Sequence, residues 1–317
     1  MRAARFTEFG PPAVMHVAEV ETPHARPGTV RVAVRASGIS PGEMHIRSGR
    51  FRDVVPTTFP WLTGFDAAGV VDEVGDGVTG VAVGDEVFGM TTTAGRAANA
   101  DFAVLTAWAA KPAAWSWEEA GGAAGAVETA TRVLDRLEIG AGHTVLVQGA
   151  AGGVGAVAVQ LAVARGAAVV GTASEGNHEF LRSLGAVATT YGDGLVDRVR
   201  ALAPSGVDGV FDCAGGALPD LVTIAGDAGR VVTIAPDFAA AGLGVHMSHG
   251  APADGTADAM GAAADPIAVH GLAVAVELAA EGRLRVPVAA AFPLTEVAAA
   301  HELCETRHAR GKIVLVH

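Results

Sequence analysis

Three closely spaced glycines in VLVQGAAGGVGAVAVQLA, residues 145–162, have the spacing of a phosphate-binding turn. An apolar run precedes Gly152, Gly153 and Gly155, and an alanine- and valine-rich segment of helical type follows them. Backbone N–H groups at a helix start carry partial positive charge and lack intrahelical partners, so an anion binds there well. A side chain at Gly152 would block a pyrophosphate, and Gly155 allows close packing of helix on strand. The motif therefore predicts dinucleotide binding; the alternative is a turn that only serves packing.

The residues after the second strand of this region indicate which dinucleotide binds. NAD sites usually place Asp or Glu there to bond the ribose 2′-hydroxyl. This chain has Thr172, Ala173 and Ser174 instead. An uncharged turn removes the repulsion that a 2′-phosphate would meet, which favours NADP(H). Glu175 is the objection, because it lies just beyond the usual position and could still reach the ribose.

Strands and helices must alternate to position these residues. The strand-like segments are TVLVQ (144–148), AAVVGTA (167–173), AVATT (186–190), VDGVFDCA (207–214) and GRVVTIA (229–235). The helical segments between them are residues 154–165, 177–184, 194–203 and 217–226. Continuous apolar strands that alternate with helices predict a parallel sheet covered on both faces, the doubly wound arrangement.

The remainder of the chain has a different pattern of predicted strands and helices. Residues 1–110 are β-rich, with short strand-like runs such as VRVAVRAS (30–37), AAGVVDEVG (67–75) and DEVFGM (85–90) between turn signals. APADGTADAMGAAAD, after residue 250, is expected to be a loop or loosely helical. Two helices (269–281 and 295–305) and a terminal strand KIVLV (312–316) are expected to follow.

Length and charge exclude several classes of protein. A chain of 317 residues predicts two domains. A net charge of −12 argues against nucleic acid and anionic membrane surfaces as partners. No apolar run reaches the roughly 18 residues of a membrane helix, and the first residues have no signal-peptide pattern. Cys213 and Cys304, which lack metal-type spacing, are expected to be reduced thiols in a cytoplasmic protein.

Several motifs together resemble those of the medium-chain dehydrogenase/reductase superfamily, in its zinc-independent quinone oxidoreductase branch. They are VRASGISPGEMHIRSG (34–49), GFDAAGVVDEVGDGVTGVAVGDEVFG (64–89), ANADF (98–102), ETATRVL (128–134), QGAAGGVGAVAVQLA (148–162), VDGVFDCAGG (207–216) and RGKIVL (310–315). The resemblance implies a GroES-like catalytic domain formed by residues 1–114 and 253–317. It implies a Rossmann NADP(H)-binding domain formed by residues 115–252.

The resemblance also implies cofactor contacts. Thr129 corresponds to a family threonine near the nicotinamide, although this chain has Glu-Thr-Ala where the family has Leu-Thr-Ala. The implied cofactor-binding residues are Ser40, Thr129, Ala150, Gly152, Gly153, Val154, Gly155, Ala173, Ser174, Asn177, His178, Tyr191, Cys213, Ile234, Ala235 and Arg307. Relatives often have lysine where Asn177 or His178 stands, which weakens that part of the correspondence. The alternatives are that Arg307 is a solvated charge at a helix end and that Cys213 only packs.

No metal site is expected. Zinc-dependent relatives have Cys-Gly-Thr-Asp and Gly-His-Glu, whereas this chain has Ser40-Pro41-Gly42-Glu43 and Gly64-Phe65-Asp66. A hydroxyl and a phenyl ring cannot replace a thiolate and an imidazole on Zn²⁺. We expect His246 and His249 to be surface or interface residues rather than ligands. The family also predicts a homodimer through the last Rossmann strand, near LGVHMSH (243–249).

Without a metal to polarise a carbonyl, hydride delivery to a quinone or to an α,β-unsaturated carbonyl is the favoured chemistry. His45 stands where relatives often have a tyrosine near the substrate, and is the candidate catalytic donor. The alternative is an exposed histidine on a short helix. Phe51 stands where enoyl-thioester reductases have a catalytic tyrosine, which argues against that activity.

Three functions stay open on the sequence alone. The first is an NADPH-dependent quinone or enone reductase acting on a small planar apolar substrate. The second is a natural-product tailoring enzyme of the same fold, which is favoured by the altered residues Ser40, Glu43 and His45. The third is a non-enzymatic NADPH-binding protein.

Overall fold

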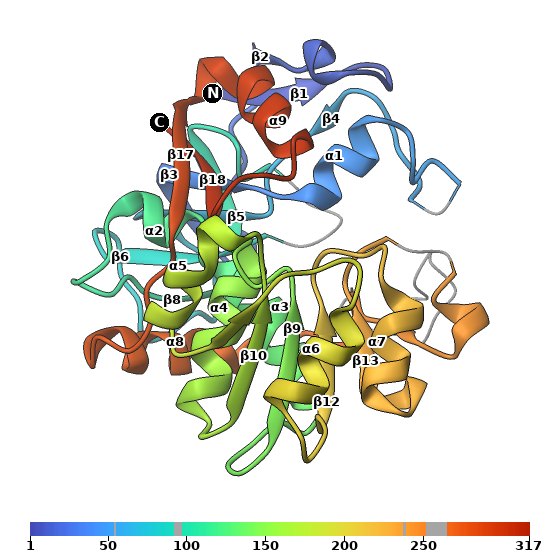
Figure 1. The fold of residues 1–317 in the computed structure, drawn as a ribbon. Coiled ribbons are helices and arrows are strands. Elements are labelled where there is room, and N and C mark those ends of the chain that lie inside the picture. The colour runs from blue at the N-terminus through green and yellow to red at the C-terminus, as the bar shows by residue number, and fades with distance from the viewer. Residues whose placement is uncertain (54, 92–96, 237–238, 252–264) are drawn as a thin grey trace. The chain divides into compact units, whose positions relative to one another are not determined.

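The computed structural model describes residues 1–53, 55–91, 97–236, 239–251 and 265–317 (Figure 1). They form two units. Unit 1 contains the described residues of Met1–Ala126 and Val269–His317, and unit 2 those of Val127–Thr256 and Ala262–Ala268. Unit 1 is rich in β-strands, and unit 2 is a parallel sheet with helices on its faces. The predicted α/β fold class, a β-rich domain plus a doubly wound domain, is confirmed.

Unit 2 has a six-stranded parallel sheet in the order β11-β10-β9-β12-β13-β14. The strands are β9 (Thr144–Gln148), β10 (Ala168–Thr172), β11 (Val187–Thr189), β12 (Gly209–Asp212), β13 (Val231–Thr233) and β14 (His246–Met247). The chain runs outward from β9 to β11 and then crosses to the other side of β9. The strand order therefore reverses between β9 and β12, where doubly wound sheets bind ligands at the carboxyl ends of their strands.

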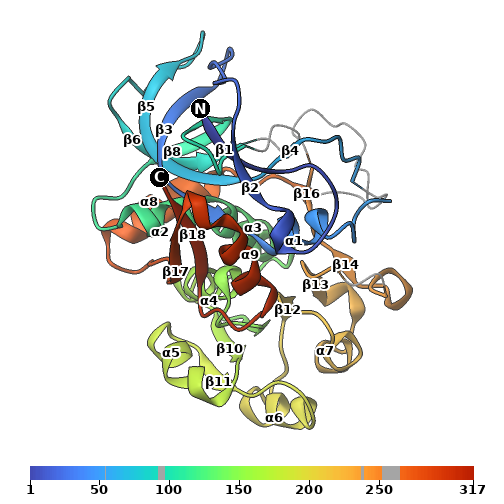
Figure 2. The same ribbon diagram turned by 90° about the horizontal axis from the view of Figure 1, so that it is seen from above.

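Helices cover both faces of this sheet, as the apolar strands predicted. They are α4 (Gly153–Ala164), α5 (His178–Ser183), α6 (Leu195–Leu202) and α7 (Leu218–Ala225), preceded by α3 (Ala124–Arg136). Leu146 and Val210 of the strands pack against Leu195 of α6 and Leu221 of α7. Figure 2 shows α6 and α7 on one side of the strands and α4 on the other. The predicted strands and helices of this region are confirmed to within two residues at each end.

Unit 1 is built on a seven-stranded sheet in the order β17-β18-β3-β5-β6-β8, with β7 also paired to β3. These strands are β3 (Val30–Ile39), β5 (Asp66–Val74), β6 (Glu86–Met90), β7 (Phe102–Leu105), β8 (Ala107–Ala110), β17 (Val288–Pro293) and β18 (Lys312–Val316). A smaller sheet has the order β2-β1-β4, with β1 (Arg2–Phe6), β2 (His16–Glu19) and β4 (Trp61–Leu62). The helices are α1 (Pro41–Arg47), α2 (Trp117–Gly121), α8 (His270–Ala280) and α9 (Val297–Glu305).

The division into units falls at residue 126, whereas the sequence placed the first boundary at 114. Close packing of α2 on β3 and β5 is the reason. A Cβ atom at Gly121 would lie 2.6 Å from the Cβ atom of Ala36, so only a glycine allows this approach. Helix α3 consequently begins in unit 1 and continues in unit 2. The second expected boundary, between residues 252 and 253, lies outside the described residues.

Two short strands, β15 (Gly250–Ala251) and β16 (Asp265–Pro266), pair on either side of residues 252–264. The loop or loose helix expected between them also lies outside the described residues. In the part of the chain that the structure describes, no helix combines the length and apolar character needed to cross a bilayer.

Candidate functional site

The turn after β9 has the geometry of an anion-binding helix start. Gly152 is the N-cap of α4, with φ −76° and ψ 177°. The N–H of Ala156 donates to the carbonyl of Gly152 at 2.9 Å, so the N–H groups of residues 153–155 precede the first bond of the helix. A Cβ atom at Gly152 would meet only the oxygen of Gly149, at 3.4 Å, whereas one at Gly155 would lie 2.3 Å from that oxygen. Gly152 therefore leaves space for a ligand, and Gly155 serves packing.

The threonine that ends β10 holds this turn in place. The Thr172 hydroxyl accepts from the N–H of Gly149 at 3.0 Å and donates to Oε1 of Gln148 at 2.6 Å. Thr172 is fully buried and Gln148 nearly so. The first turn of the glycine motif is therefore fixed from the neighbouring strand, a role that the sequence analysis did not assign to Thr172.

The expected 2′-phosphate residues follow the carboxyl ends of two neighbouring strands. Thr172 of β10 pairs with Thr189 of β11, and Ser174 and Tyr191 each stand two residues after this pair. Asn177 Nδ2 donates to the Ser174 hydroxyl at 3.1 Å. Tyr191 is 58% exposed. Three side chains with hydrogen-bonding groups thus lie at one sheet edge.

The other residues near this cluster differ in accessibility. Ala173 is buried at the strand end, and His178 is half-buried at the start of α5. Glu175 is exposed in the short helix Glu175–Asn177.

Arg198, on α6, orders the loop that carries Tyr191. Its guanidinium donates to the carbonyls of Thr190 at 2.9 Å and Asp193 at 2.6 Å, and more weakly to that of Tyr191 at 3.4 Å. A positive charge therefore lies against this loop. Arg198 could not be predicted from the sequence, because nothing in its local pattern separates it from the exposed Arg200 on the same helix.

Asp212 joins the loops after β12 and β13. Its Oδ1 accepts from the N–H groups of Ala214 at 3.0 Å and Gly215 at 2.9 Å, and its Oδ2 accepts from the Thr233 hydroxyl at 2.8 Å. The carboxylate is fully buried, so these donors compensate for lost hydration. Asp212 was also missed, although an Asp that ends an apolar strand is a usable signal.

Cys213 follows this carboxylate directly. Burial, and then the charge of Asp212, raise the pKa of the Cys213 thiol well above its ordinary value. The thiol is therefore protonated at neutral pH, and a nucleophilic role is disfavoured.

Most expected cofactor residues lie at or near the carboxyl edge of the sheet in unit 2, because parallel strands end at the same edge. They are Ala150, Gly152, Gly153, Val154, Gly155, Ala173, Ser174, Asn177, His178, Tyr191, Cys213, Ile234 and Ala235. Thr129 lies on α3 and is half-buried. Ser40, His45 and Arg307 belong to unit 1.

His45 lies on α1 and is buried, since only 5% of its surface is exposed. Its ring centroid is 5.3 Å from that of Phe51. Burial, followed by the charges of Arg50 and Arg307, lowers the pKa of His45 to about 4. The imidazole is therefore neutral at pH 7, where it can donate one N–H hydrogen bond. Arg307 is exposed just after α9, at a positive φ of 56°.

Glu43 and Asp66, which lie in the two segments that differ from those of zinc-dependent relatives, are bonded within the protein. Glu43 accepts from the N–H of Ser40 at 3.2 Å and, at shorter range, from that of Gly64, in a capping box at the start of α1. Asp66 pairs with Lys312 at 3.5 Å, and both side chains are buried. Among the described residues, no group of three or more His, Cys, Asp or Glu side chains could hold a metal ion. That no metal is bound stays a prediction.

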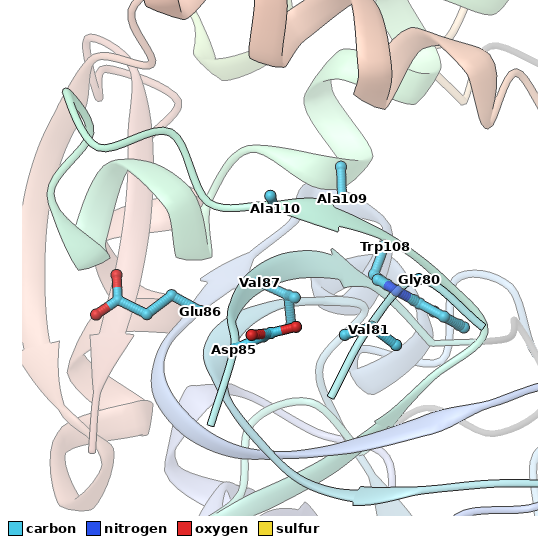
Figure 3. Close-up of a pocket in the computed structure, with 8 residues that line it drawn as sticks. All are labelled: Gly80, Val81, Asp85, Glu86, Val87, Trp108, Ala109 and Ala110. Atoms are coloured by element: carbon cyan, nitrogen blue, oxygen red, sulfur yellow. The ribbon is translucent and has the colours of Figure 1, made fainter. Parts of the chain in front are cut away.

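A surface hollow of about 420 Å³ lies at the edge of the large sheet in unit 1 (Figure 3). Strands β6 and β8 and the loop that begins at Gly80 line it. Asp85 accepts from the N–H of Ala82 at 2.8 Å, and Glu86 pairs with Lys111 at 3.4 Å. Figure 3 shows Glu86 pointing away from the indole of Trp108. The lining contains none of the predicted site residues.

Two family models match the chain. A model described as alcohol dehydrogenase GroES-like domain matches residues 26–137, and one described as zinc-binding dehydrogenase matches residues 184–315.

Known proteins resemble the chain over different lengths. The quinone oxidoreductase of Rattus norvegicus is 35% identical over 216 residues, 62% of this chain and 64% of that protein, so the match spans less than two thirds of the rat protein. The chloroplastic NADPH-dependent alkenal/one oxidoreductase of Arabidopsis thaliana is 30% identical over 328 residues, 99% of this chain and 79% of that protein. The structure of the quinone oxidoreductase from Coxiella burnetii matches with a TM-score of 0.80 and 28% identity, over 100% of this chain and 99% of that chain.

Proposed function

Since the chain belongs to the medium-chain dehydrogenase/reductase superfamily, in its quinone oxidoreductase branch, we propose that it is a zinc-independent, NADPH-dependent reductase. Its acceptor would be a quinone or an α,β-unsaturated carbonyl. The observation that carries the proposal is the open glycine turn beside the uncharged end of β10 in unit 2. The printed names of the rat and Arabidopsis relatives support the acceptor class.

The turn after β9 would hold the cofactor's pyrophosphate. The N–H groups of residues 153–155, at the start of α4, provide partial positive charge, and Gly152 leaves room for close approach. Ser174, Asn177 and Tyr191 would bind the 2′-phosphate, with Arg198 adding positive potential to the same loop. Preference for NADPH over NADH follows from the missing carboxylate at the end of β10.

Zinc independence rests on donor chemistry. Ser40 and Phe65 stand at the positions of the thiolate and imidazole ligands, and neither side chain replaces them on Zn²⁺. Glu43 and Asp66 are already bonded to backbone N–H groups and to Lys312. The reductase must therefore stabilise charge on its acceptor without a metal at this position.

NADPH, when bound, supplies a hydride. His45 would stabilise the negative charge that develops on the acceptor's oxygen by donating an N–H hydrogen bond. With a pKa of about 4 it does so as neutral imidazole, so its donation should persist from pH 6 to pH 8. Loss of one such donor typically costs about 10²–10³ in turnover.

Substitution of His45 tests this role. His45→Ala should lower enone turnover by about 10² while leaving the Kd for NADPH nearly unchanged. His45→Gln, which keeps an N–H donor, is the matched control and should retain most of the rate. Equal enone rates for wild type and His45→Ala would show that water or another residue provides the stabilisation.

A steady-state screen of quinones, enones and enoyl thioesters with NADPH and with NADH tests the function as a whole. The proposal expects turnover of quinones or enones, higher kcat/KM with NADPH, and little activity on thioesters. Binding of NADPH without turnover of any acceptor would instead indicate a non-enzymatic NADPH-binding protein. Turnover confined to polycyclic natural-product acceptors would indicate a tailoring enzyme.

A further inference from the structure

The surface hollow of about 420 Å³ in unit 1 has the size of a small-molecule site. Strands β6 and β8 and the loop between Gly80 and Asp85 line it. Val87 of the lining is buried in the core of the large sheet, and Val81 and Trp108 pack against that core. The hollow therefore has an apolar side that is supported from behind.

The indole of Trp108 gives this side an aromatic surface that the protein itself does not use. The neighbouring tryptophans have ring partners, since Trp115 packs edge-on against Phe88 and Trp117 has the Lys111 amine 4.7 Å from its ring centroid. Trp108 is half-buried, and among the described residues it has no ring partner, no cation and no hydrogen bond from its Nε1–H. Its ring is thus available to a ligand, and the face of an indole attracts cations.

The carboxylate of Asp85 is the charged group that the hollow offers. Its Oδ2 accepts from the N–H of Ala82 at 2.8 Å, and the Asp85 N–H donates to the Ala82 carbonyl at 3.1 Å. The Asp85 carbonyl accepts from the N–H of Val71, in β5, at 2.9 Å. In the part of the chain that the structure describes, Oδ1 has no partner and no basic side chain pairs with the carboxylate. The charge is therefore fixed in place before a ligand binds, which lowers the entropic cost of binding.

The other carboxylate of the lining is already neutralised. Glu86 pairs with Lys111 at 3.4 Å, and Figure 3 shows it pointing away from the indole of Trp108. The lining contains no Lys, Arg or His, and the whole chain has a net charge of −12. The hollow thus combines one unpaired negative charge with one unused aromatic ring, and it offers nothing that would bind an anion.

We propose that this hollow binds a small organic cation, in which an ammonium group is attached to an apolar body. The ammonium group pairs with Asp85 and contacts the ring of Trp108, and the apolar body lies against Val81. The inference is independent of the proposed function, because the lining contains none of the residues predicted to bind cofactor or acceptor.

NMR titration of the indole N–H signals tests the proposal. The chain has four tryptophans, and the signal that disappears in Trp108→Phe is that of Trp108. The probes are 2-phenylethylamine, which carries an ammonium group at pH 7, and 2-phenylethanol, which has the same body without the charge. Attraction of the ammonium to one exposed carboxylate and one exposed ring is worth about tenfold in affinity. Wild type should therefore bind the amine about tenfold more tightly than the alcohol.

Two substitutions on the same lining separate a specific site from general attraction to an acidic protein. Asp85→Asn keeps an oxygen that can accept from the Ala82 N–H but removes the charge, so the preference for the amine should fall to about threefold. Glu86→Gln is the matched control, because it changes the net charge equally but affects a carboxylate that already pairs with Lys111. It should keep the full preference.

A third variant tests the aromatic contribution. Trp108→Leu keeps an apolar side chain and should also reduce the preference to about threefold, as read from the backbone N–H signals of residues 80–87. Thermal unfolding of each variant establishes that it is folded.

Several outcomes would overturn the proposal. Equal affinity of wild type for amine and alcohol would show that the charge is not recognised, and an equal fall in Asp85→Asn and Glu86→Gln would show only general electrostatic attraction. Absence of any shift of the Trp108 signal with either probe would show that the hollow does not bind such molecules. Tighter binding of Nα-acetyl-lysine methylamide than of 2-phenylethylamine would indicate a lysine side chain of a partner protein in place of a small molecule.

Discussion

Alanine substitutions at Gly152 and Gly155 should separate the glycine that leaves room for a ligand from the glycine that packs helix on strand. At Gly155 the added Cβ atom would lie 2.3 Å from the oxygen of Gly149 and 2.8 Å from Cα of Ala150. Both neighbours are backbone atoms, so α4 and the turn must move apart. At Gly152 the added atom meets only that oxygen, at an ordinary 3.4 Å, and its φ of −76° suits alanine.

These distances give opposite effects on stability and binding. Forced overpacking costs about 1–3 kcal/mol, so Gly155→Ala should lower the free energy of unfolding by about 2 kcal/mol. Gly152→Ala should change it by no more than about 0.5 kcal/mol, as for a substitution without steric conflict. Its methyl group would nevertheless occupy the approach of the pyrophosphate. We expect NADPH affinity to fall at least about tenfold, or about 1.4 kcal/mol.

Urea unfolding measures the first effect, and fluorescence titration with NADPH measures the second. The discriminating variant is Gly152→Ala, which should be as stable as wild type but defective in binding. If it binds NADPH with wild-type affinity, the pyrophosphate does not lie against Gly152 and the proposed site is wrong. If Gly155→Ala is as stable as wild type, the packing argument fails.

Three further predictions concern acidity, metal content and assembly. Burial, and then the charge of Arg47, lower the pKa of His301 to about 3, whereas the unfolded chain protonates this residue below about pH 6.5. The free energy of unfolding should therefore fall by about 2 kcal/mol between pH 7 and pH 5. His301→Leu should remove that part of the pH dependence, as measured by urea unfolding. Because Ser40 and Phe65 stand at the ligand positions, elemental analysis should find no stoichiometric zinc, and chelators should leave activity unchanged; about one zinc per chain would contradict this. Light scattering at micromolar concentration should give a dimer mass, with residues 243–249 at the edge of the sheet in the interface, and a monomer mass would disprove it.

Periodicity predicted the doubly wound unit well because its strands are short apolar runs between clear turn signals. TVLVQ has the predicted bounds in β9, and in unit 1 KIVLV has the predicted bounds in β18. β14, the last strand of the parallel sheet, covers His246–Met247 and is shorter than LGVHMSH (243–249) suggested. Gly244 has a φ of +74° and ends a short helical turn, so the extended strand can begin only after it.

The site was less predictable where it depends on contacts between distant residues. The glycine turn and Ser174 have local signals, but the sequence does not show that Arg198 binds the carbonyls of residues 190–193. Nor does it show that His45 is buried beside Phe51, which lowers its pKa to about 4 and so keeps the imidazole neutral well below pH 6.5. Both facts follow from tertiary packing, which local patterns do not encode.

Tyr191 is the chain's single tyrosine, and it is 58% exposed at the carboxyl edge of the sheet in unit 2. Protein produced with ¹³C-labelled tyrosine will therefore give NMR signals from one ring only, with no assignment problem. Because Arg198 holds the backbone of its loop, shifts on adding a nucleotide will report contacts of the ring rather than rearrangement of the loop. The ring shifts measured on titration with adenosine 2′-phosphate can then be compared with those on titration with adenosine. The difference between them measures what the phosphate group contributes to binding beside Tyr191.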